Sequence, residues 1–288
     1  MAEAPILGVI GGSGLYEIDG LIHSQRLEIS TPYGNPSAPL IAGELEGKRV
    51  VFLARHGIGH HISPSEINYR ANIYAMKSLG VNRIVSISAC GSLREDYKPG
   101  HIIVPDQIFD FTRVRERSFF GNGIVAHVGV ADPFCPDLSA KLFQALGEVG
   151  ADRHSEGTYI TIEGPRFSTR AESNLFRSWG MSVIGMTAAP EIFLAKEAEI
   201  CYTTMAHVTD YDVWHTTEEP VSVEMVIRTL NRNTLLAQNA IKHLLVHLAD
   251  ERDCHCESAL ENAIITNRAV IPEETRSNFS LLIQKYIK

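Results

Sequence analysis

The segment Thr209-Asp210-Tyr211-Asp212 places two carboxylates one residue apart. On an extended segment, residues i and i+2 project to the same side, so we expect Asp210 and Asp212 to lie together. Two neighbouring carboxylates do not both ionise easily, which predicts that the pKa of one is raised. That aspartic acid would be able to protonate a leaving group near neutral pH. A solvated acidic turn or a helix N-cap is the alternative interpretation.

A protonated Asp210 would suit one class of ligand in particular. A 6-aminopurine presents an acceptor at N7 beside a donor at its exocyclic amine, whereas a 6-oxopurine presents two acceptors. One protonated carboxyl matches the aminopurine pair with its O–H and its C=O. The acidic pair therefore favours a 6-aminopurine as the base that this site would bind.

A second group of residues has the chemistry of an anion site. Gly11-Gly12-Ser13-Gly14 follows an apolar run and would present backbone N–H groups and a hydroxyl. Arg55 ends another apolar run, where its guanidinium would hold two phosphate oxygens in a bidentate manner, and His56 adds a donor. A tight turn and a surface ion pair are the alternatives. The glycine spacing differs from the dinucleotide-binding fingerprint, so we expect no dinucleotide.

Small residues and hydroxyls follow three further apolar runs. Ser88-Ala89-Cys90-Gly91-Ser92 would let a ligand approach the backbone closely, and Cys90 lacks the basic neighbours that activate a thiol. Phe167 offers a purine an aromatic face, and Gly185-Met186-Thr187 offers a soft sugar contact and a hydroxyl. Each segment alone is as consistent with core or loop. Ligands of open α/β sheets, however, gather where strands end, so the recurrence favours a shared site.

The other cysteines have less defined roles. Cys254-His255-Cys256 lies close to His243 and His247, and this group would be able to bind a metal or form a redox clip. We prefer the interpretation of an exposed polar loop between helices. Cys135 and Cys201 would be able to approach each other, but sequence does not give the separation that a disulfide needs.

Elements of alternating type must position these segments. Ser63 and Glu66 form a capping box that predicts a helix running to Leu79. We expect one α/β domain over residues 1–250, with helices on both faces of its sheet, and a helical extension over 251–288 that packs on this domain or on a neighbouring subunit. Apolar periodicity predicts helices near 138–149, 171–179 and 222–248, and strands at 6–10, 40–45, 49–54, 83–89, 101–109, 157–162, 181–186 and 201–208.

Composition excludes several classes of function. The chain of 288 residues is 44% hydrophobic and 21% charged, as in ordinary globular proteins. Its net charge of -8 and its lack of a basic stripe argue against nucleic acid or acidic lipid as partners. No stretch reaches the roughly 20 apolar residues of a membrane span, and the first residues lack the features of a signal peptide. We therefore expect a cytoplasmic protein that binds no membrane.

A series of motifs resembles the methylthioadenosine phosphorylases of the nucleoside phosphorylase superfamily. The motifs extend over about residues 8–236 and read GGSGLY, LARHG, NYRANI, ACGSLRE, DPFCP, TIEGPRFSTRAES, GMTAAPE and TDYDVW. The resemblance implies a single three-layer α/β/α domain with a central mixed, twisted sheet. It also implies phosphorolysis of S-methyl-5'-thioadenosine to adenine and 5-methylthioribose 1-phosphate, with inorganic phosphate as co-substrate and no cofactor or catalytic metal. A homotrimer or a dimer of trimers is implied as well.

The resemblance assigns roles to individual positions. Asp210 matches the acid that faces N7, and Asp212 matches a second residue that holds the purine. The residues that match the phosphate site are Ser13, Arg55, His56, Ser88, Ala89 and Thr187, with serine at two positions where relatives often have threonine. The residues that match the nucleoside site are Met186, Phe167, Ala89 and Gly91, with specificity set by Ser168, Val223 and, from a neighbouring subunit, His127.

Three other functions are considered. A phosphorylase for 6-oxopurine nucleosides, such as inosine or methylthioinosine, is disfavoured by Asp210 and Asp212, because oxopurine sites tend to carry an amide. A hydrolytic nucleosidase is disfavoured by the anion site around Arg55. A non-catalytic nucleoside-binding protein would carry the same pocket, since motifs alone do not establish turnover.

Overall fold

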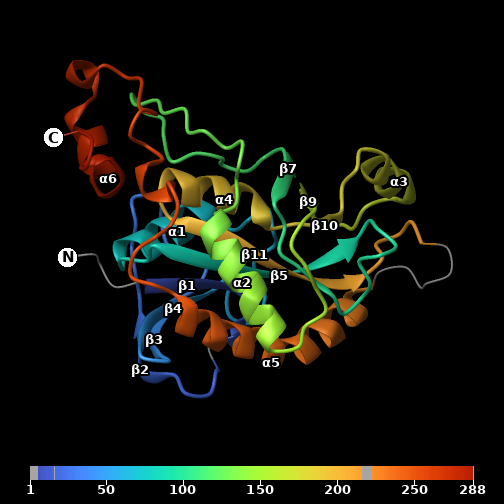
Figure 1. Cartoon of the computed structure of the whole chain (residues 1–288). Helices are drawn as coiled ribbons and strands as arrows, with labels where there is room; N and C mark the ends of the chain where they lie inside the picture. Colours follow the sequence, from blue (N-terminus) through green and yellow to red (C-terminus); the bar gives the residue numbers. More distant parts are fainter. Residues whose placement is uncertain (1–5, 16, 216–221, 288) are drawn as a thin grey trace.

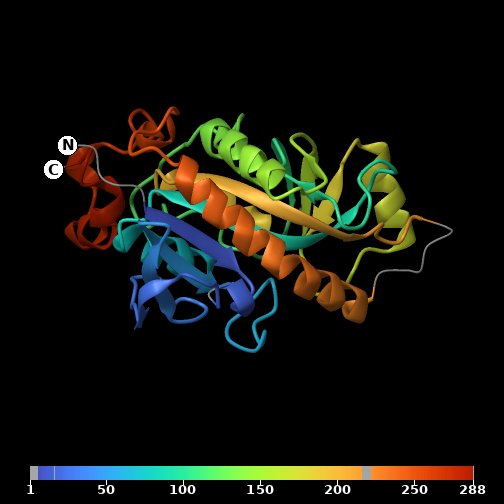
Figure 2. The ribbon, with the colours of Figure 1, turned by 60° about the horizontal axis from the view of Figure 1, so that its bottom comes forward.

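A mixed sheet lies between two layers of helices (Figure 1). The computed structural model describes residues 6–15, 17–215 and 222–287, without the side chains of residues 13 and 225–232. Helices α2 (Pro136–Glu148) and α5 (Val223–His247) cover one face of the sheet, and α1 (Tyr69–Ser78) and α4 (Ala188–Glu197) cover the other. Figure 2 shows α2 and α5 side by side on their face. The expected three-layer α/β/α domain is confirmed.

Strand β5 (Arg83–Ser92) organises the sheet. It pairs in parallel with β1 (Ile6–Gly11) and along its length with β11 (Cys201–Asp210), and its end pairs antiparallel with β10 (Val183–Gly185). All residues of β11 are buried, as expected for a parallel strand covered on both faces. The remaining strands are β2 (Ile22–Leu27), β3 (Leu40–Leu45), β4 (Lys48–Ala54), β6 (Ile102–Ile103), β7 (Gln107–Phe111), β8 (Arg153–His154) and β9 (Thr158–Ile162).

The alternation of side chains along β1 divides the core between the two helical layers. Ile6 and Ile10 pack in the apolar cluster under α1 and α4, while Leu7 and Val9 pack in the cluster under α2 and α5. Successive residues of a strand point to opposite faces, so one short strand contributes to both clusters. This arrangement leaves the strand ends, rather than the faces of the sheet, free for a ligand.

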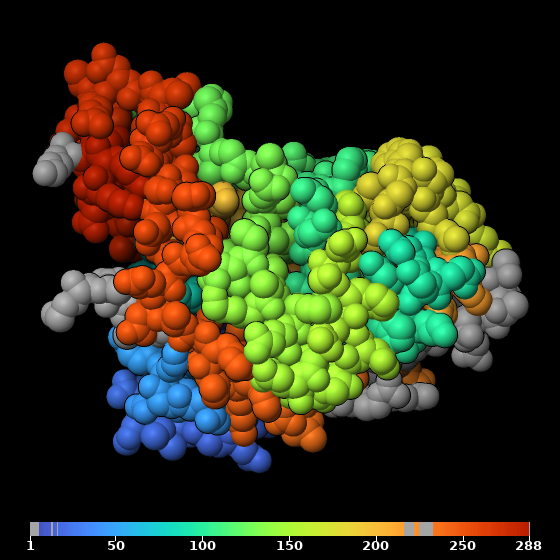
Figure 3. Space-filling model, viewed as in Figure 1, coloured from blue at the N-terminus to red at the C-terminus, as the bar shows by residue number. Residues whose placement is uncertain are grey.

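The C-terminal segment packs on the same core. After α5 the chain forms the short helices η2 (Cys256–Ser258) and η3 (Arg268–Val270) and then α6 (Glu273–Ile283). Phe279, Leu282 and Ile283 join the apolar cluster under α1. Figure 3 shows this segment along one side of the molecule, against the chain that precedes α2. The predicted boundary at residue 250 stays a prediction.

Two predicted elements need correction. The helix expected from Ser63 begins instead at Tyr69, after Asn68, whose side chain accepts the N–H of Ala71. Glu66 does accept the N–H and the hydroxyl of Ser63, but this pair closes an isolated turn. The expected strand at 101–109 is divided into β6 and β7.

One helix was not predicted at all. Helix α4 has apolar or buried residues on all sides, so it lacks the polar stripe that marks an amphipathic helix. Helices α2, α3 (Arg170–Ser178) and α5 lie where periodicity placed them, within about two residues. Among the described residues, no helix combines the length and hydropathy that crossing a bilayer requires.

Candidate active site

Several of the predicted site residues meet at the carboxyl end of β5. Gly91 pairs with Asp210 on β11 and with Ile184 on β10. A Cβ atom at Gly91 would lie 3.0 Å from Asp210 Oδ1 and 3.2 Å from the Cβ of Asp212. The absence of a side chain at this position therefore lets both carboxylates pack against the strand.

Asp210 and Asp212 are brought together by a turn rather than by an extended strand. Strand β11 ends at Asp210, and its register against β5 shifts between Val208 and Asp210. Asp212 has a φ of 53°, in the left-handed region, and its backbone N–H donates to Asp210 Oδ1 at 2.7 Å. The predicted proximity is present, but the predicted geometry of residues i and i+2 on a strand is wrong.

Burial is the main reason that the acidity of Asp210 is unusual. The residue is 4% exposed, and desolvation raises its pKa to about 6. The charge of Asp212 raises the pKa further by a smaller amount, while hydrogen bonds from Thr209 Oγ1 and the backbone of Asp212 lower it. The predicted cause, repulsion between carboxylates, is thus secondary to burial. A neutral carboxyl is accessible near neutral pH.

Asp212 is held by the segment that leads into α3. The hydroxyl of Ser168 donates to both carboxylate oxygens of Asp212, at 2.7 and 2.6 Å, and burial raises the pKa of Asp212 as well. Thr169 and Glu172 then form a capping box that starts α3. Phe167, directly before Ser168, is exposed and free to meet a ligand.

Arg55 does not present the open fork that the sequence predicts. It is 2% exposed, and its Nε and Nη2 atoms donate to the carboxylate of Glu191 on α4 at 2.8 and 2.9 Å. Nη2 also donates to Ser86 Oγ at 2.6 Å, and Nη1 donates to the carbonyl of Ile87 at 3.1 Å. The bidentate edge is therefore occupied, and Nη1 alone retains an N–H for an anion.

The hydroxyls expected at an anion site lie around Tyr159. Ser88 Oγ is 3.4 Å from Tyr159 Oη, and a Cβ atom at Gly185 would lie 1.9 Å from that same oxygen. The chain after β10 thus passes close to Ser88. Thr187 precedes α4 and makes no side-chain capping bond, so its hydroxyl stays available. The helical backbone is interrupted at Ala189, with φ of -103° and ψ of 138°, so the regular part of α4 begins only after that residue.

The N–H of the His56 ring donates within the protein rather than to the expected anion. Its Nδ1 lies 2.9 Å from the carbonyl of Ile62, which places the proton of the neutral ring on Nδ1. Burial, followed by the nearby charge of Arg55, lowers the pKa of His56 to about 4, so the ring is neutral at pH 7. Its Nε2 can therefore accept a hydrogen bond from a protonated phosphate oxygen.

Arg115 is a positioning residue that sequence reasoning missed. Its Nη1 donates to the carbonyls of Met186 and Ala189, both at 2.7 Å, and its Nε donates to Glu163 Oε1 at 2.9 Å. These bonds fix the backbone on either side of Thr187. Arginines alternate with other residues over 113–117, a pattern typical of a solvated segment. Nothing in the sequence distinguishes the buried Arg115 from the other arginines of this segment.

Three predicted residues lie outside this group. The backbone of Ser13 lies in η1 (Ser13–Leu15) directly after β1, but its side chain is outside the described residues. Val223 is an exposed residue at the start of α5. His127 is exposed, and its backbone N–H donates to the carbonyl of Ala263 in the segment that follows α5. Figure 2 shows that this segment lies beyond the end of α5, away from the start of the helix. One chain does not bring His127 and Val223 together.

The model of the phosphorylase superfamily matches residues 6–246 of the chain. The chain belongs to this superfamily. S-methyl-5'-thioadenosine phosphorylases of Geobacter sulfurreducens and Koribacter versatilis are 54% and 48% identical to it, over 98% and 97% of this chain and 99% and 96% of theirs. The fold and family that the motifs implied are thereby confirmed.

Solved structures give the same grouping. A methylthioadenosine phosphorylase from an Antarctic soil metagenomic library is 46% identical and has a TM-score of 0.93, with 97% of this chain and 99% of that chain covered. Methylthioadenosine phosphorylase from Schistosoma mansoni in complex with adenine is 33% identical, with a TM-score of 0.81 and 98% of each chain covered. The likeness to these phosphorylases thus extends over nearly the whole chain.

Replacing Arg55 with alanine should strongly destabilise this superfamily member, because the carboxylate of Glu191 would stay buried without its partner. Removal of one partner from a buried ion pair costs about 3–5 kcal/mol. Urea denaturation measures the loss. The double variant Arg55→Met/Glu191→Leu is the control, since replacing both charges should cost much less. Equal losses in the two variants would contradict the role of the pair.

Asp210→Asn should change how stability depends on pH. The folded-state pKa of about 6 exceeds the ordinary value near 3.9, so the contribution of Asp210 is fully present below pH ~4 and is lost as pH rises through ~6. The variant has no such carboxyl and does not undergo this loss. The difference in free energy of unfolding, variant minus wild type, should therefore rise by roughly 2–3 kcal/mol between pH 4 and pH 7. The exposed Asp132→Asn is the matched control in urea titrations at each pH. A difference between variant and wild type that is the same at pH 4 and pH 7 would refute the raised pKa.

Proposed function

We propose that the chain catalyses phosphorolysis of S-methyl-5'-thioadenosine to adenine and 5-methylthioribose 1-phosphate. The relatives named above carry this activity in their names, and they match the chain over nearly its full length. The structural observation that supports the proposal best is Asp210, a buried carboxyl with a pKa raised to about 6 that packs against the end of β5 at Gly91. Such a group can protonate a departing purine.

The reaction needs charge stabilisation at both ends of a stretching bond. Cleavage of the N-glycosidic bond builds positive charge on the sugar and negative charge on the purine. Asp210 in its neutral form donates its proton to N7 as the base leaves. Phosphate attacks the anomeric carbon from the opposite side, so the configuration at that carbon is inverted. Met186, which matches the ribose contact of the family, would contact the ribose hydroxyls between the two groups.

The phosphate site relies on dipoles more than on a free cation. The charge of Arg55 is balanced by Glu191, which leaves Nη1 as a single donor. The hydroxyls of Thr187 and Ser88 supply the remaining donors, and Nε2 of His56 accepts from a protonated oxygen. Positioning of this kind can lower a barrier by roughly 7–11 kcal/mol in favourable cases. We propose that no cofactor takes part.

The carboxyl pair supports a 6-aminopurine over a 6-oxopurine. Asp212, oriented by Ser168, offers an acceptor to the exocyclic amine, while Asp210 offers a donor to N7. Hypoxanthine would place a carbonyl oxygen where the amine is expected. The phosphorylase for 6-oxopurine nucleosides therefore remains the second candidate.

We also propose an assembly and a location for the enzyme. His127 lies far from the start of α5 within one chain, so a neighbouring copy is needed to bring this histidine to the 5' end of the nucleoside beside Val223. A homotrimer or a dimer of trimers would supply it. The free state of all five cysteines supports a reducing compartment such as the cytoplasm.

The proposed function predicts phosphate-dependent release of adenine from S-methyl-5'-thioadenosine. Chromatography of reactions with and without phosphate should show adenine and the sugar phosphate only when phosphate is present. Adenosine and inosine in parallel reactions test the base, and little hypoxanthine release is expected. Equal base release without phosphate would instead indicate hydrolysis, and preferred release of hypoxanthine would indicate the 6-oxopurine enzyme.

Two variants should separate proton donation from phosphate binding. Asp210→Asn cannot pass a proton, so its kcat should fall roughly 100-fold or more, with the KM for phosphate little changed. Thr187→Val removes a hydroxyl at the N-terminus of α4, so the KM for phosphate should rise more than the KM for the nucleoside. Steady-state kinetics with each substrate varied measures both. Near wild-type turnover of Asp210→Asn would exclude its role as the acid.

A further inference from the structure

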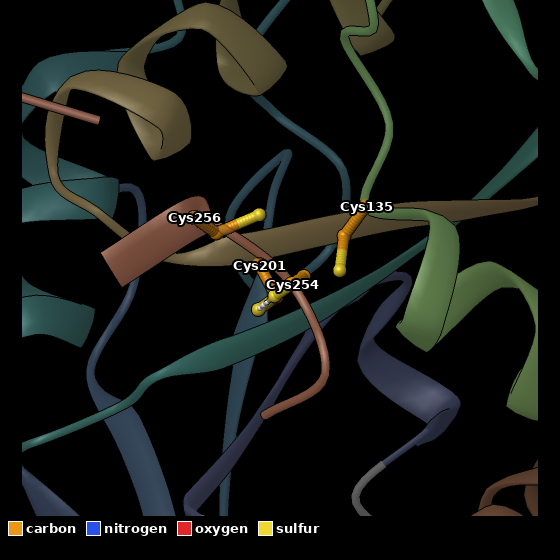
Figure 4. Close-up of side chains that lie close together, drawn as sticks. All are labelled: Cys135, Cys201, Cys254 and Cys256. Carbon is orange, nitrogen blue, oxygen red and sulfur yellow. Dashed lines mark hydrogen bonds between the residues drawn. The ribbon is translucent and has the colours of Figure 1, made fainter. Parts of the chain in front are cut away.

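Four of the five cysteines form a buried cluster far from the candidate active site (Figure 4). The sulfur atoms of Cys135, Cys201, Cys254 and Cys256 all lie within 4.8 Å of one another. Cys135 is the N-cap of α2, Cys201 begins β11, and the other two follow α5. Cys256 is buried and Cys254 is half-buried, so the expected exposed loop at residues 254–256 is exposed only at His255. Segments distant in sequence thus converge on one point.

The spacing of the sulfurs suits a metal ion better than disulfides. All four side chains are free thiols, and the sulfurs of Cys201 and Cys254 are 3.4 Å apart, whereas a disulfide bond is about 2.05 Å long. A tetrahedral zinc ion with Zn–S bonds of about 2.3 Å requires sulfurs roughly 3.8 Å apart. Four mutually close sulfurs fit this requirement, while two disulfides would shorten only two of the six distances. His243 and His247, also considered as ligands, bind Glu148 instead.

The surroundings of the cluster are positively charged, whereas a zinc ion bound by four thiolates carries a net negative charge. Arg83 is 1% exposed, its Nε has no hydrogen-bond partner among the described residues, and it interacts electrostatically with three of the four cysteines. The Nη1 atom of Arg252 lies 4.0 Å from Cys201 Sγ. The backbone N–H of Leu138, in the first turn of α2, donates to Cys135 Sγ at 3.5 Å. Two guanidinium groups and a helix N-terminus would therefore stabilise negative sulfur.

We propose that Cys135, Cys201, Cys254 and Cys256 bind one zinc ion as four thiolates. Binding of Zn²⁺ releases the four thiol protons and leaves a net charge of about -2, which Arg83 and Arg252 offset. No electron transfer is involved. The four protein ligands fill the tetrahedral coordination shell, which is typical of a structural zinc site rather than a catalytic one.

The position of the site on β11 determines what the zinc ion does. Cys201 and Asp210 are the first and last residues of this ten-residue strand, so the site and the acid lie roughly 30 Å apart. The ion therefore takes no part in bond cleavage. It joins the C-terminal segment to the starts of β11 and α2, and it stabilises the folded chain because the unfolded chain lacks the preformed site.

Elemental analysis of the intact protein, purified without an affinity tag or added metal, tests the proposal. About one zinc per chain is expected by mass spectrometry. After removal of zinc by a chelator under reducing conditions, the melting temperature should fall, and Co²⁺ should restore it with the intense visible absorption of a tetrahedral thiolate complex. Phosphate-dependent activity at low temperature should persist in the metal-free protein, which separates this test from that of the proposed function.

Variants identify the ligands. Cys254→Ser and Cys256→Ser should each lower zinc content at least tenfold, whereas Cys90→Ala, at the cysteine outside the cluster, and His255→Ala, at the exposed residue between two ligands, should keep it. Stoichiometric iron in place of zinc would overturn the assignment. So would metal-free protein that binds no Co²⁺ after reduction, or a count of one or three free thiols in protein denatured with chelator, which would indicate disulfides.

Discussion

The buried ion pair between Arg55 and Glu191 is the interaction on which the arrangement of the strand ends depends. Arg55 follows β4 and also donates to Ser86 on β5, while Glu191 lies on α4 and accepts from Tyr202 on β11. Removing two charges from water is costly, and here every strong partner is satisfied, so the elements are fixed in one register. The same pairing neutralises the cation that an anion site would otherwise use. In the proposed site, phosphate would then be held mainly by hydroxyl and N–H donors.

Burial has a different effect on Asp210, at the other end of the site. Asp210 is removed from water without a cationic partner among the described residues, and its pKa rises accordingly. Gly91 allows this because a side chain there would meet the carboxylate. Arg115 holds the backbone on both sides of Thr187 by donating to the carbonyls of Met186 and Ala189. The proposed site thus combines a buried ion pair, which fixes the strand ends, with a buried carboxyl that has no cationic partner among the described residues.

The sequence was informative where chemistry depends on local residue type. Strand ends rich in glycine and hydroxyls, and the acidic pair at Asp210, were predictable because ligands of α/β sheets bind at strand ends. Partners distant in the chain were not: Glu191 is 136 positions from Arg55, and nothing in residues 113–117 distinguishes Arg115. The cysteine cluster was foreseen only in part: Cys135 with Cys201, and Cys254 with Cys256, were considered separately, and nothing in the sequence brings the two pairs together. Helix α4 was missed because a fully buried helix has no amphipathic pattern.

The contribution of α6 to the apolar cluster under α1 has a consequence for synthesis of the chain. Ile6 on the first strand and Phe279, Leu282 and Ile283 near the end of the chain belong to one apolar cluster. During translation this cluster stays incomplete until α6 has left the ribosome, because the ring of Phe279 packs on those of Tyr33 and Phe120. Contacts so remote along the chain close late and slow folding. The nascent chain is therefore expected to rely on chaperones until its final helix has docked.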